Sequence, residues 1–246
     1  MTHLIRSEIR KLTTTKMPVA FLVVLIVIAA LNAFAVIKGA DMDGSKAFIS
    51  TAADQQSLMA FAFNAFMGAG LFGAIAVARE YGQNTVVPTF LASPRRHRAV
   101  LAQLVAVAIG GSILSLIGAG LTVIAVAASL PTTDYGFLVS AGTVGRVITA
   151  SAFAGAAGAV LGAGVGAIVR NVGGAVTLTI FSFIIAPPLV AQFASGTASW
   201  MPANLANVIS GTVDDVSQPA ALLAFVVWAA VPAIVGLIAV QRRDVV

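Results

Sequence analysis

The sequence contains no cysteine, and only 9% of its 246 residues are charged. The absence of cysteine excludes disulfide bonds and thiolate metal sites. An average soluble domain carries about 25% charged residues, so a soluble fold of this chain could not cover its surface with polar groups. The hydrophobic fraction of 59% and the mean hydropathy of +1.00 indicate that lipid surrounds most of the chain.

Motifs for catalysis and nucleotide binding are also missing. The sequence has no HExxH, no CxxC and no GxxxxGK[ST] loop, since no Gly-Lys pair occurs in it. No acidic residue or histidine lies near the centre of a long apolar run, which argues against a proton-driven transporter and a voltage sensor. We therefore expect no enzymatic activity, and neither a metal nor a cofactor in this chain.

Six apolar runs are long enough to cross a membrane as helices, which takes roughly 20 residues. No series of alternating ten-residue segments, as a membrane barrel needs, is present. We predict an all-α integral membrane bundle, with its third span interrupted at Gly110-Gly111. The six predicted spans cover about 17–37, 56–78, 99–128, 143–169, 172–194 and 220–240.

Basic residues predict the orientation of these spans, because cytoplasmic loops are rich in Lys and Arg. With the N-terminus in the cytoplasm, all of the 14 Lys and Arg residues except Lys38, Lys46 and Arg146 fall on the cytoplasmic side. Arg146 is then expected to anchor the outer end of the fourth span. Both termini are predicted to be cytoplasmic, in a multi-pass protein of the inner or plasma membrane. Because the basic residues flank apolar runs, we expect no nucleic-acid partner despite a pI of about 10.2.

Two segments outside the spans have patterns of their own within the predicted layout of 1–16 followed by a six-span domain, 17–246. In residues 1–16, Ile5, Ile9 and Leu12 recur at helical spacing opposite basic residues, which predicts an amphipathic helix at the membrane interface, in contact with lipid. A simple basic flank without a helix is the alternative. Residues 195–219 are too polar to span the membrane. They predict either an amphipathic or re-entrant element on the outer face or an ordered surface loop.

A few small and polar residues inside the runs suggest helix contacts. Gly158, Gly162 and Gly166 recur every four residues and predict a close packing face, either within the bundle or between protomers. Asn32 and Asn64 lie within the first and second spans. They are interpreted either as interhelical hydrogen-bonding residues or as positions that line a substrate path.

The predicted cytoplasmic loop 79–98 is longer than two adjacent helices need. The second span exits at Arg79 and Glu80, and the segment 80–87 is expected to continue as a short helix, although Gly82 weakens it. Prolines follow, and the basic run 95–98 leads into the third span. This pattern favours a structured elbow that docks onto a soluble partner. The alternative is a surface loop whose charges only fix topology.

This layout resembles the transmembrane permease subunit of type-2 ABC exporters. The resemblance rests on the basic amphipathic segment, the six spans, the EYGQNTV segment with LASPRR downstream, and the semi-polar outer segment. It implies that the segment after span two is a coupling helix, with Glu80 paired to a basic group and with Tyr81 and Val86 in apolar contact. The implied ATPase-coupling residues are Arg79, Glu80, Tyr81, Gly82, Gln83, Asn84, Thr85 and Val86.

The resemblance also implies a function and partners. The chain would export a hydrophobic or amphipathic cargo, driven by ATP and Mg²⁺ on a separate ABC-type ATPase subunit, and would pair with a second copy or a homologous permease. Two other functions stay open from the sequence. One is a non-transporting membrane scaffold or immunity protein, and the other is an ATP-independent channel or scramblase.

Overall fold

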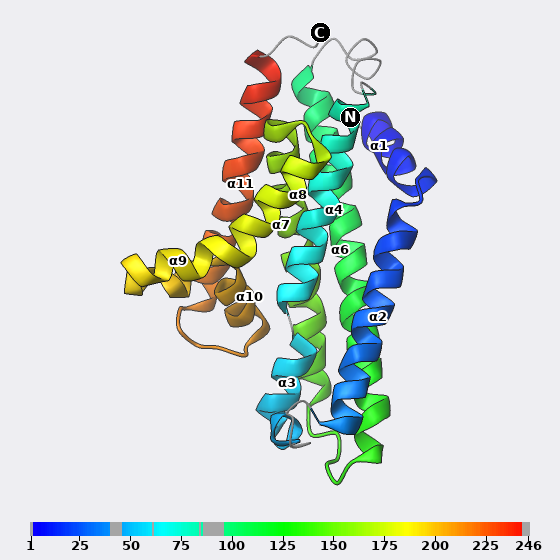
Figure 1. Cartoon of the computed structure of the whole chain (residues 1–246), viewed down its shortest axis with the longest axis vertical. Helices are drawn as coiled ribbons and strands as arrows, with labels where there is room; N and C mark the ends of the chain where they lie inside the picture. Colours follow the sequence, from blue (N-terminus) through cyan, green and yellow to red (C-terminus); the bar gives the residue numbers. More distant parts are fainter. Residues whose placement is uncertain (1, 40–45, 61, 84, 86–95, 243–246) are drawn as a thin grey trace.

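The computed structural model of the chain describes residues 2–39, 46–60, 62–83, 85 and 96–242 (Figure 1). In these ranges the regular elements are all helices. The α-helices are α1 (Thr2–Thr14), α2 (Met17–Lys38), α3 (Ala52–Ala60), α4 (Ala62–Gly82), α6 (Arg96–Ser129), α7 (Ala141–Val169), α8 (Val172–Ile180), α9 (Ala186–Phe193), α10 (Pro202–Ser210) and α11 (Gln218–Arg242). Short 3-10 turns are η1 (Ala47–Ile49), η2 (Leu130–Thr132) and η4 (Ser195–Trp200), and η3 (Phe181–Ile185) is π-helical.

Within the described residues, five helical segments are long and apolar enough to cross a membrane. They are Met17–Lys38, His97–Thr132, Ala141–Val169, Val172–Phe193 and Gln218–Gln241. An all-α, multi-pass membrane protein is expected to have this architecture. The predicted second span, 56–78, is shared between α3 and α4, which follow one another along the bundle on either side of residue 61 (Figure 1).

The predicted interruption of the third span is wrong, because α6 runs unbroken through Gly110 and Gly111. The two glycines mark close contacts instead. A Cβ at Gly110 would lie 2.9 Å from the Phe72 ring, and a Cβ at Gly111 would lie 2.6 Å from the Gly155 carbonyl oxygen. Small residues at these positions allow α6 to approach α4 and α7, so a sequence pattern typical of a helix break here marks a helix crossing.

The fifth predicted span is bent. Its first half is α8, the π-helical η3 follows, and α9 then projects sideways from the bundle (Figure 1). Pro187 and Pro188 open α9, and proline supplies no backbone N–H to the preceding turn. A π-helical turn and prolines are among the recognised causes of sharp bends in helices, so both features account for the change of direction.

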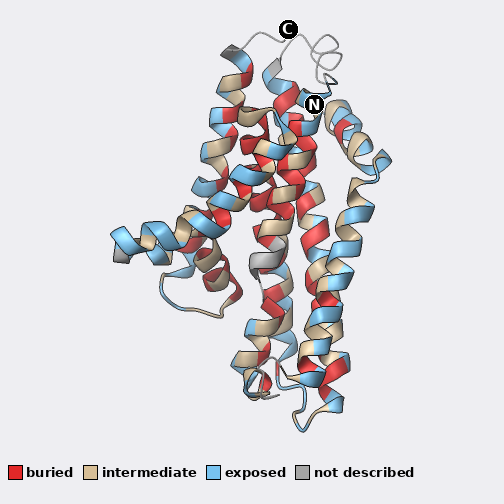
Figure 2. Cartoon of the chain, viewed as in Figure 1, coloured by how far each residue is buried: buried red, intermediate tan, exposed pale blue. Residues whose placement is uncertain are grey.

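The helix α7 is the centre of the bundle, with neighbours on most of its surface (Figure 2). The predicted glycine row faces α4 within the same chain. A Cβ at Gly162 would overlap the Gly70 carbonyl group, and a Cβ at Gly166 would lie 2.7 Å from the Ala74 carbonyl oxygen. A Cβ at Gly158 would lie 2.6 Å from the Phe66 carbonyl oxygen. The two backbones are therefore in direct contact along α4 and α7.

At the end of the bundle opposite α1, the buried side chain of Gln55 in α3 connects two backbone segments. Its amide nitrogen donates to the carbonyl oxygens of Ile49 (3.1 Å) and Gly136 (2.9 Å), and its amide oxygen accepts from the Leu138 N–H at 2.9 Å. Gln55 is fully buried. It therefore satisfies backbone groups of the short turn η1 and of the segment 136–138, which precedes α7.

The segment 195–219 folds back onto the bundle through α10, whose buried face includes Leu205, Val208 and Ile209. Gly211 ends this helix in the left-handed conformation (φ 80°). Arg146 of α7 donates to the carbonyl oxygens of Ile209 (3.3 Å) and Val208 (3.5 Å). Arg146 therefore caps α10, a contact that its predicted role as a membrane-boundary anchor did not include.

We predict that Gly162→Ala lowers the unfolding free energy by about 1–3 kcal/mol, because the added methyl group forces α4 and α7 apart. The matched control is Gly145→Ala on the same helix, where a Cβ meets nothing within 4 Å. That control should leave stability unchanged or raise it by up to about 1 kcal/mol, since alanine favours the helix. Thermal unfolding in detergent measures both. Equal effects of the two substitutions would contradict the close α4–α7 contact.

We also predict that Gln55→Leu lowers the unfolding free energy by about 2–3 kcal/mol, because it leaves buried backbone groups without partners. Gln218→Leu, at an exposed position at the start of α11, is the matched control and should have little effect. Protease sensitivity of the loops around 49 and 136 should rise only in the first variant. Unchanged stability of Gln55→Leu would show that these loops do not depend on the buried amide.

Candidate docking site at the end of α4

Several helix ends meet at one end of the bundle. The start of α1, the end of α4, the start of α6, the α7–α8 turn and the end of α11 all lie there (Figure 1). The predicted coupling residues that the structure describes, 79–83 and 85, belong to this end, together with the basic residues of α1. The structure therefore brings the predicted coupling segment close to the amphipathic N-terminal helix.

The helix α4 continues beyond the predicted end of its span and finishes with a closed last turn. It ends at Gly82, and the Gln83 N–H donates to the Arg79 carbonyl oxygen at 3.0 Å. Thr85 then donates to the Glu80 carbonyl oxygen from both its N–H (3.0 Å) and its hydroxyl (3.2 Å). A bond that spans five residues is typical of a Schellman-type helix end. Residues 79–83 and Thr85 thus belong to a hydrogen-bonded helix end.

Glu80 is held by α1. Its carboxylate lies 3.6 Å from the Lys11 ammonium, which in turn lies 2.7 Å from the carboxylate of Glu8. The Glu80 side chain is 17% exposed and that of Glu8 only 7%. One lysine therefore neutralises two largely buried acids, one on each helix, and joins α1 to the end of α4.

The electrostatic balance at Glu80 is set mainly by burial, which raises the pKa of its carboxyl above the ordinary value of 4.5. Lys11 opposes this shift, and the neighbouring Glu8 adds to it. A hydrogen bond from the buried Gln103 of α6 also favours the charged form. Because burial is the largest effect, the charged Glu80 depends on Lys11 to stay ionised at this position.

Tyr81 is held by a second cation from the other side. The Arg170 guanidinium carbon lies 5.0 Å from the centre of the Tyr81 ring, a cation–π geometry. Burial raises the pKa of the Tyr81 hydroxyl to about 12, although Arg170 opposes the shift. The ring joins the apolar cluster that contains Val77 and Val240. Tyr81 is thus directed into the bundle, rather than to a free surface as its predicted partner contact requires.

Arg170 occupies the turn between α7 and α8 with a left-handed backbone (φ 57°), which is uncommon for a residue with a side chain. Its N–H donates to the Gly166 carbonyl oxygen at 2.8 Å, and Asn171 caps α8 by accepting from the Gly174 N–H at 3.0 Å. The guanidinium also donates to the Ala239 carbonyl oxygen at 3.4 Å. Arg170 therefore connects the end of α4 with α7, α8 and α11.

The outward side of this helix end consists of Arg79, Gly82, Gln83 and Thr85, all exposed. Arg79 Nε donates to Gln83 Oε1 at 3.2 Å, which orders two long side chains on the surface. A cavity of about 240 Å³ lies beside them, between the end of α4 and the last turn of α1 with the adjoining Thr15. This exposed, ordered surface can accept a partner protein.

The remaining predicted site residues lie elsewhere. Asn84 and Val86 are outside the described residues, and so is the side chain of Asn64, which is in α4. Asn32 Nδ2 donates to the Ile28 carbonyl oxygen of its own helix at 2.9 Å. Gly158, Gly162 and Gly166 contact α4, as described above. Among the residues described here, no group of three or more His, Cys, Asp or Glu side chains could hold a metal ion.

Sequence reasoning missed Lys11 and Arg170. Both were counted only as basic residues on the cytoplasmic side. The i, i+3 spacing of Glu8 and Lys11 signals an ion pair within α1, but nothing in the sequence shows that Glu80 lies beside it. A search with protein-family models and a search of curated proteins find no match for the chain.

Two substitutions in the cluster of Glu8, Lys11 and Glu80 should differ in their effect on the unfolding free energy. Lys11→Met should lower the unfolding free energy at pH 7 by about 1–2 kcal/mol, since two buried acids lose their cation. Glu80→Gln should not lower it, because burial outweighs the attraction of Lys11. The Trp fluorescence of thermally unfolding protein measures both variants. Equal losses in the two variants would show that the ion pair is net stabilising.

The pH dependence tests the same cluster. A carboxyl whose pKa is raised in the folded state binds its proton more tightly when folded, so it stabilises at low pH and loses this contribution as the pH rises through the raised pKa. The unfolding free energy of the wild type, measured as a function of pH, should therefore decrease as the pH rises above 4.5, the ordinary pKa of a glutamate side chain. Glu80→Gln should lack it.

Proposed function

We propose that the chain is the membrane-spanning permease subunit of an ATP-binding cassette exporter. In this proposal a separate ATPase docks on the end of α4, and a second copy or a homologous permease completes the transporter. ATP and Mg²⁺ act on the ATPase, and this chain needs no cofactor. The proposed location is the inner or plasma membrane, with six spans and both termini in the cytoplasm.

The arrangement of the helix ends supports this topology. The segments α3 and α4 follow one another over the length of α6 (Figure 1), and in this proposal they together form the remaining one of the six spans. The start of α1 and the end of α11 lie at the same end of the bundle as the end of α4 (Figure 1). Exposed basic residues gather there as well, including Arg6, Arg10 and Arg98. By the positive-inside rule, this concentration of basic residues supports a cytoplasmic location for this end.

The observation that carries the proposal is how the end of α4 is fixed. Its outward residues are free to meet a partner, whereas Glu80 and Tyr81 are tied inward to Lys11 and Arg170. A force on the exposed side would reach α1, the α7–α8 turn and α11 through these contacts. A coupling element needs both properties, since a loose loop would absorb the partner's motion without moving a span.

The proposed cargo is hydrophobic or amphipathic. Much of the apolar surface of α2 and α11 is exposed in the single chain (Figure 2), and the predicted spans carry no charge near their centres. Two copies would enclose a path between such faces. ATP binding would draw the two docking sites together and change which side of the membrane the path opens to, as in alternating access.

Co-purification tests the proposal. A soluble ATPase with a Walker A loop, encoded beside this chain, should co-purify with the wild type in mild detergent. The double variant Arg79→Glu/Gln83→Glu changes only the exposed side of the helix end and should lose most of the ATPase, because like charge and lost contacts act together at an interface.

The matched control is Lys16→Glu, another exposed basic residue at the same end but outside residues 79–85. It should keep the ATPase, and all variants should elute as the wild type does on gel filtration. Retention of the ATPase by the double variant would contradict docking at α4. If the wild type retains no ATPase, a scaffold is favoured. Flux of a lipid or dye through liposomes that contain the chain alone would favour a channel or scramblase.

A further inference from the structure

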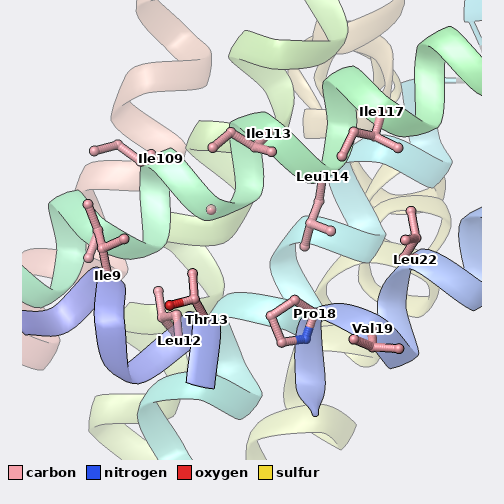
Figure 3. Close-up of a pocket in the computed structure, with 12 residues that line it drawn as sticks. Ile9, Leu12, Thr13, Pro18, Val19, Leu22, Ile109, Ile113, Leu114 and Ile117 are labelled. Carbon is pink, nitrogen blue, oxygen red and sulfur yellow. The ribbon is translucent and has the colours of Figure 1, made fainter. Parts of the chain in front are cut away.

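An apolar groove lies where α1, α2 and α6 meet (Figure 3). It measures about 260 Å³ and is lined on one side by Ile9 and Leu12 of α1, and on another by Val19 of α2. Ile113 and Ile117 of α6 form its third side. Thr13 supplies the one polar side chain of the lining. A polar ligand would find almost no hydrogen-bonding partner in this groove.

Local sequence explains why the groove is open. The surface of α6 that faces α1 carries Ala106 and Gly110, and the absence of large side chains there leaves space between the two helices. The chain bends at residues 15–16, between α1 and α2, and the two helices run in different directions (Figure 1). Side chains such as Val19 and Ile113 are about half exposed there. The groove is therefore a built feature of three helices, continuous with the apolar outer surface of α2 and α6.

Exposed basic residues lie close in sequence to residues that line the groove. Arg6 lies three residues before Ile9, and Lys16 lies two residues before Pro18, which also lines the groove. Both basic residues are exposed, as is Arg10. The acid of α1, Glu8, is buried and paired with Lys11, and Glu80 of α4 meets the same lysine. Within the part of the chain that the structure describes, the exposed side of α1 thus presents positive charge from Arg6 and Arg10, and its own acid is buried.

We propose that this groove binds an acyl chain of an anionic phospholipid, whose phosphate meets the exposed basic residues of α1. The two parts of such a lipid match the two parts of the site. The chain fits a lining with hardly any polar group, and the headgroup fits a basic helix at the membrane interface. The inference depends on the chain being a membrane protein, and it holds whether or not the chain transports a substrate.

The site has a structural consequence for the docking end. Leu12 lines the groove, and the adjacent Lys11 holds Glu80. A lipid in the groove would support α1 from beneath and keep Lys11 in place beside α4. Loss of the lipid would therefore loosen α1 first.

Photo-crosslinking tests the proposal on the full chain in liposomes. The probe is phosphatidylglycerol with a diazirine at the end of one acyl chain, diluted in phosphatidylcholine. After irradiation, mass spectrometry of peptides should find adducts concentrated in residues 9–22 and 106–117. Unlabelled phosphatidylglycerol should compete better than phosphatidylcholine by about fivefold, and Arg6→Gln/Arg10→Gln should remove this preference.

Filling the groove provides the matched comparison. Ile113→Trp and, from the side of α2, Val19→Trp should each abolish the concentration of adducts in these two segments. Ile124→Trp on α6, which is 65% exposed and does not line the groove, should leave it unchanged. Adducts spread evenly over α2, α6 and α11, or unaffected by both filling variants, would overturn the proposal. Equal competition by the two lipids would overturn its anionic part.

Discussion

The direct backbone contact between α4 and α7 is the constraint on which the rest of the structure depends. Glycines on both helices remove the side chains that would keep the backbones apart. In a membrane, where apolar surface alone gives little reason for helices to associate, such close packing is a main source of stability. It fixes the position of α4 in the bundle, and with it the direction in which Glu80 and Tyr81 leave the helix.

Two cations also hold the end of α4 in place. Lys11 approaches Glu80 from α1, and Arg170 covers Tyr81 from the α7–α8 turn. Neither contact would form if α4 were displaced along α7, because both require the last turn of α4 at one height. The end of α4 is therefore attached by side-chain contacts to α1 and to the α7–α8 turn, whereas its outer side remains exposed. This combination is what the proposed coupling role requires.

Composition and hydropathy were enough to predict an all-α membrane protein and the approximate limits of most apolar helices, since lipid imposes these features directly on sequence. The exposed face of α1 also agrees with the helical spacing of its basic residues. Gly110-Gly111 was misinterpreted as a break, because a glycine pair has the same appearance in sequence whether a helix bends or is crossed by another. The bend after α8 was missed as well, although Pro187 and Pro188 signal it.

The site could be predicted only in part. The segment 79–86 was selected from its polarity and its resemblance to a family, but the inward or outward direction of each side chain depends on neighbours far away in sequence. Lys11 and Glu80 are 69 residues apart, and Tyr81 and Arg170 are 89 apart. Such pairs result from the packing of whole helices, so they cannot be predicted from a local sequence pattern. Glu80 and Tyr81 therefore support the proposed docking site from within the bundle, and Arg79 and Gln83 lie on its exposed surface.

One distance measurement tests the central claim directly. The sequence has no cysteine, so Lys16→Cys gives one spin-labelling site in each copy of this chain. Lys16 is exposed, its neighbours Thr15 and Met17 line the cavity beside the end of α4, and it lies outside the docking surface of the assembled complex with the neighbouring ATPase. The account predicts that the distance between the labels of the two copies shortens when a non-hydrolysable ATP analogue binds, because the ATPases draw the ends of α4 together. An unchanged distance, with ATP binding to the complex verified, would contradict the role of α4 as the element that couples an ATPase to the spans.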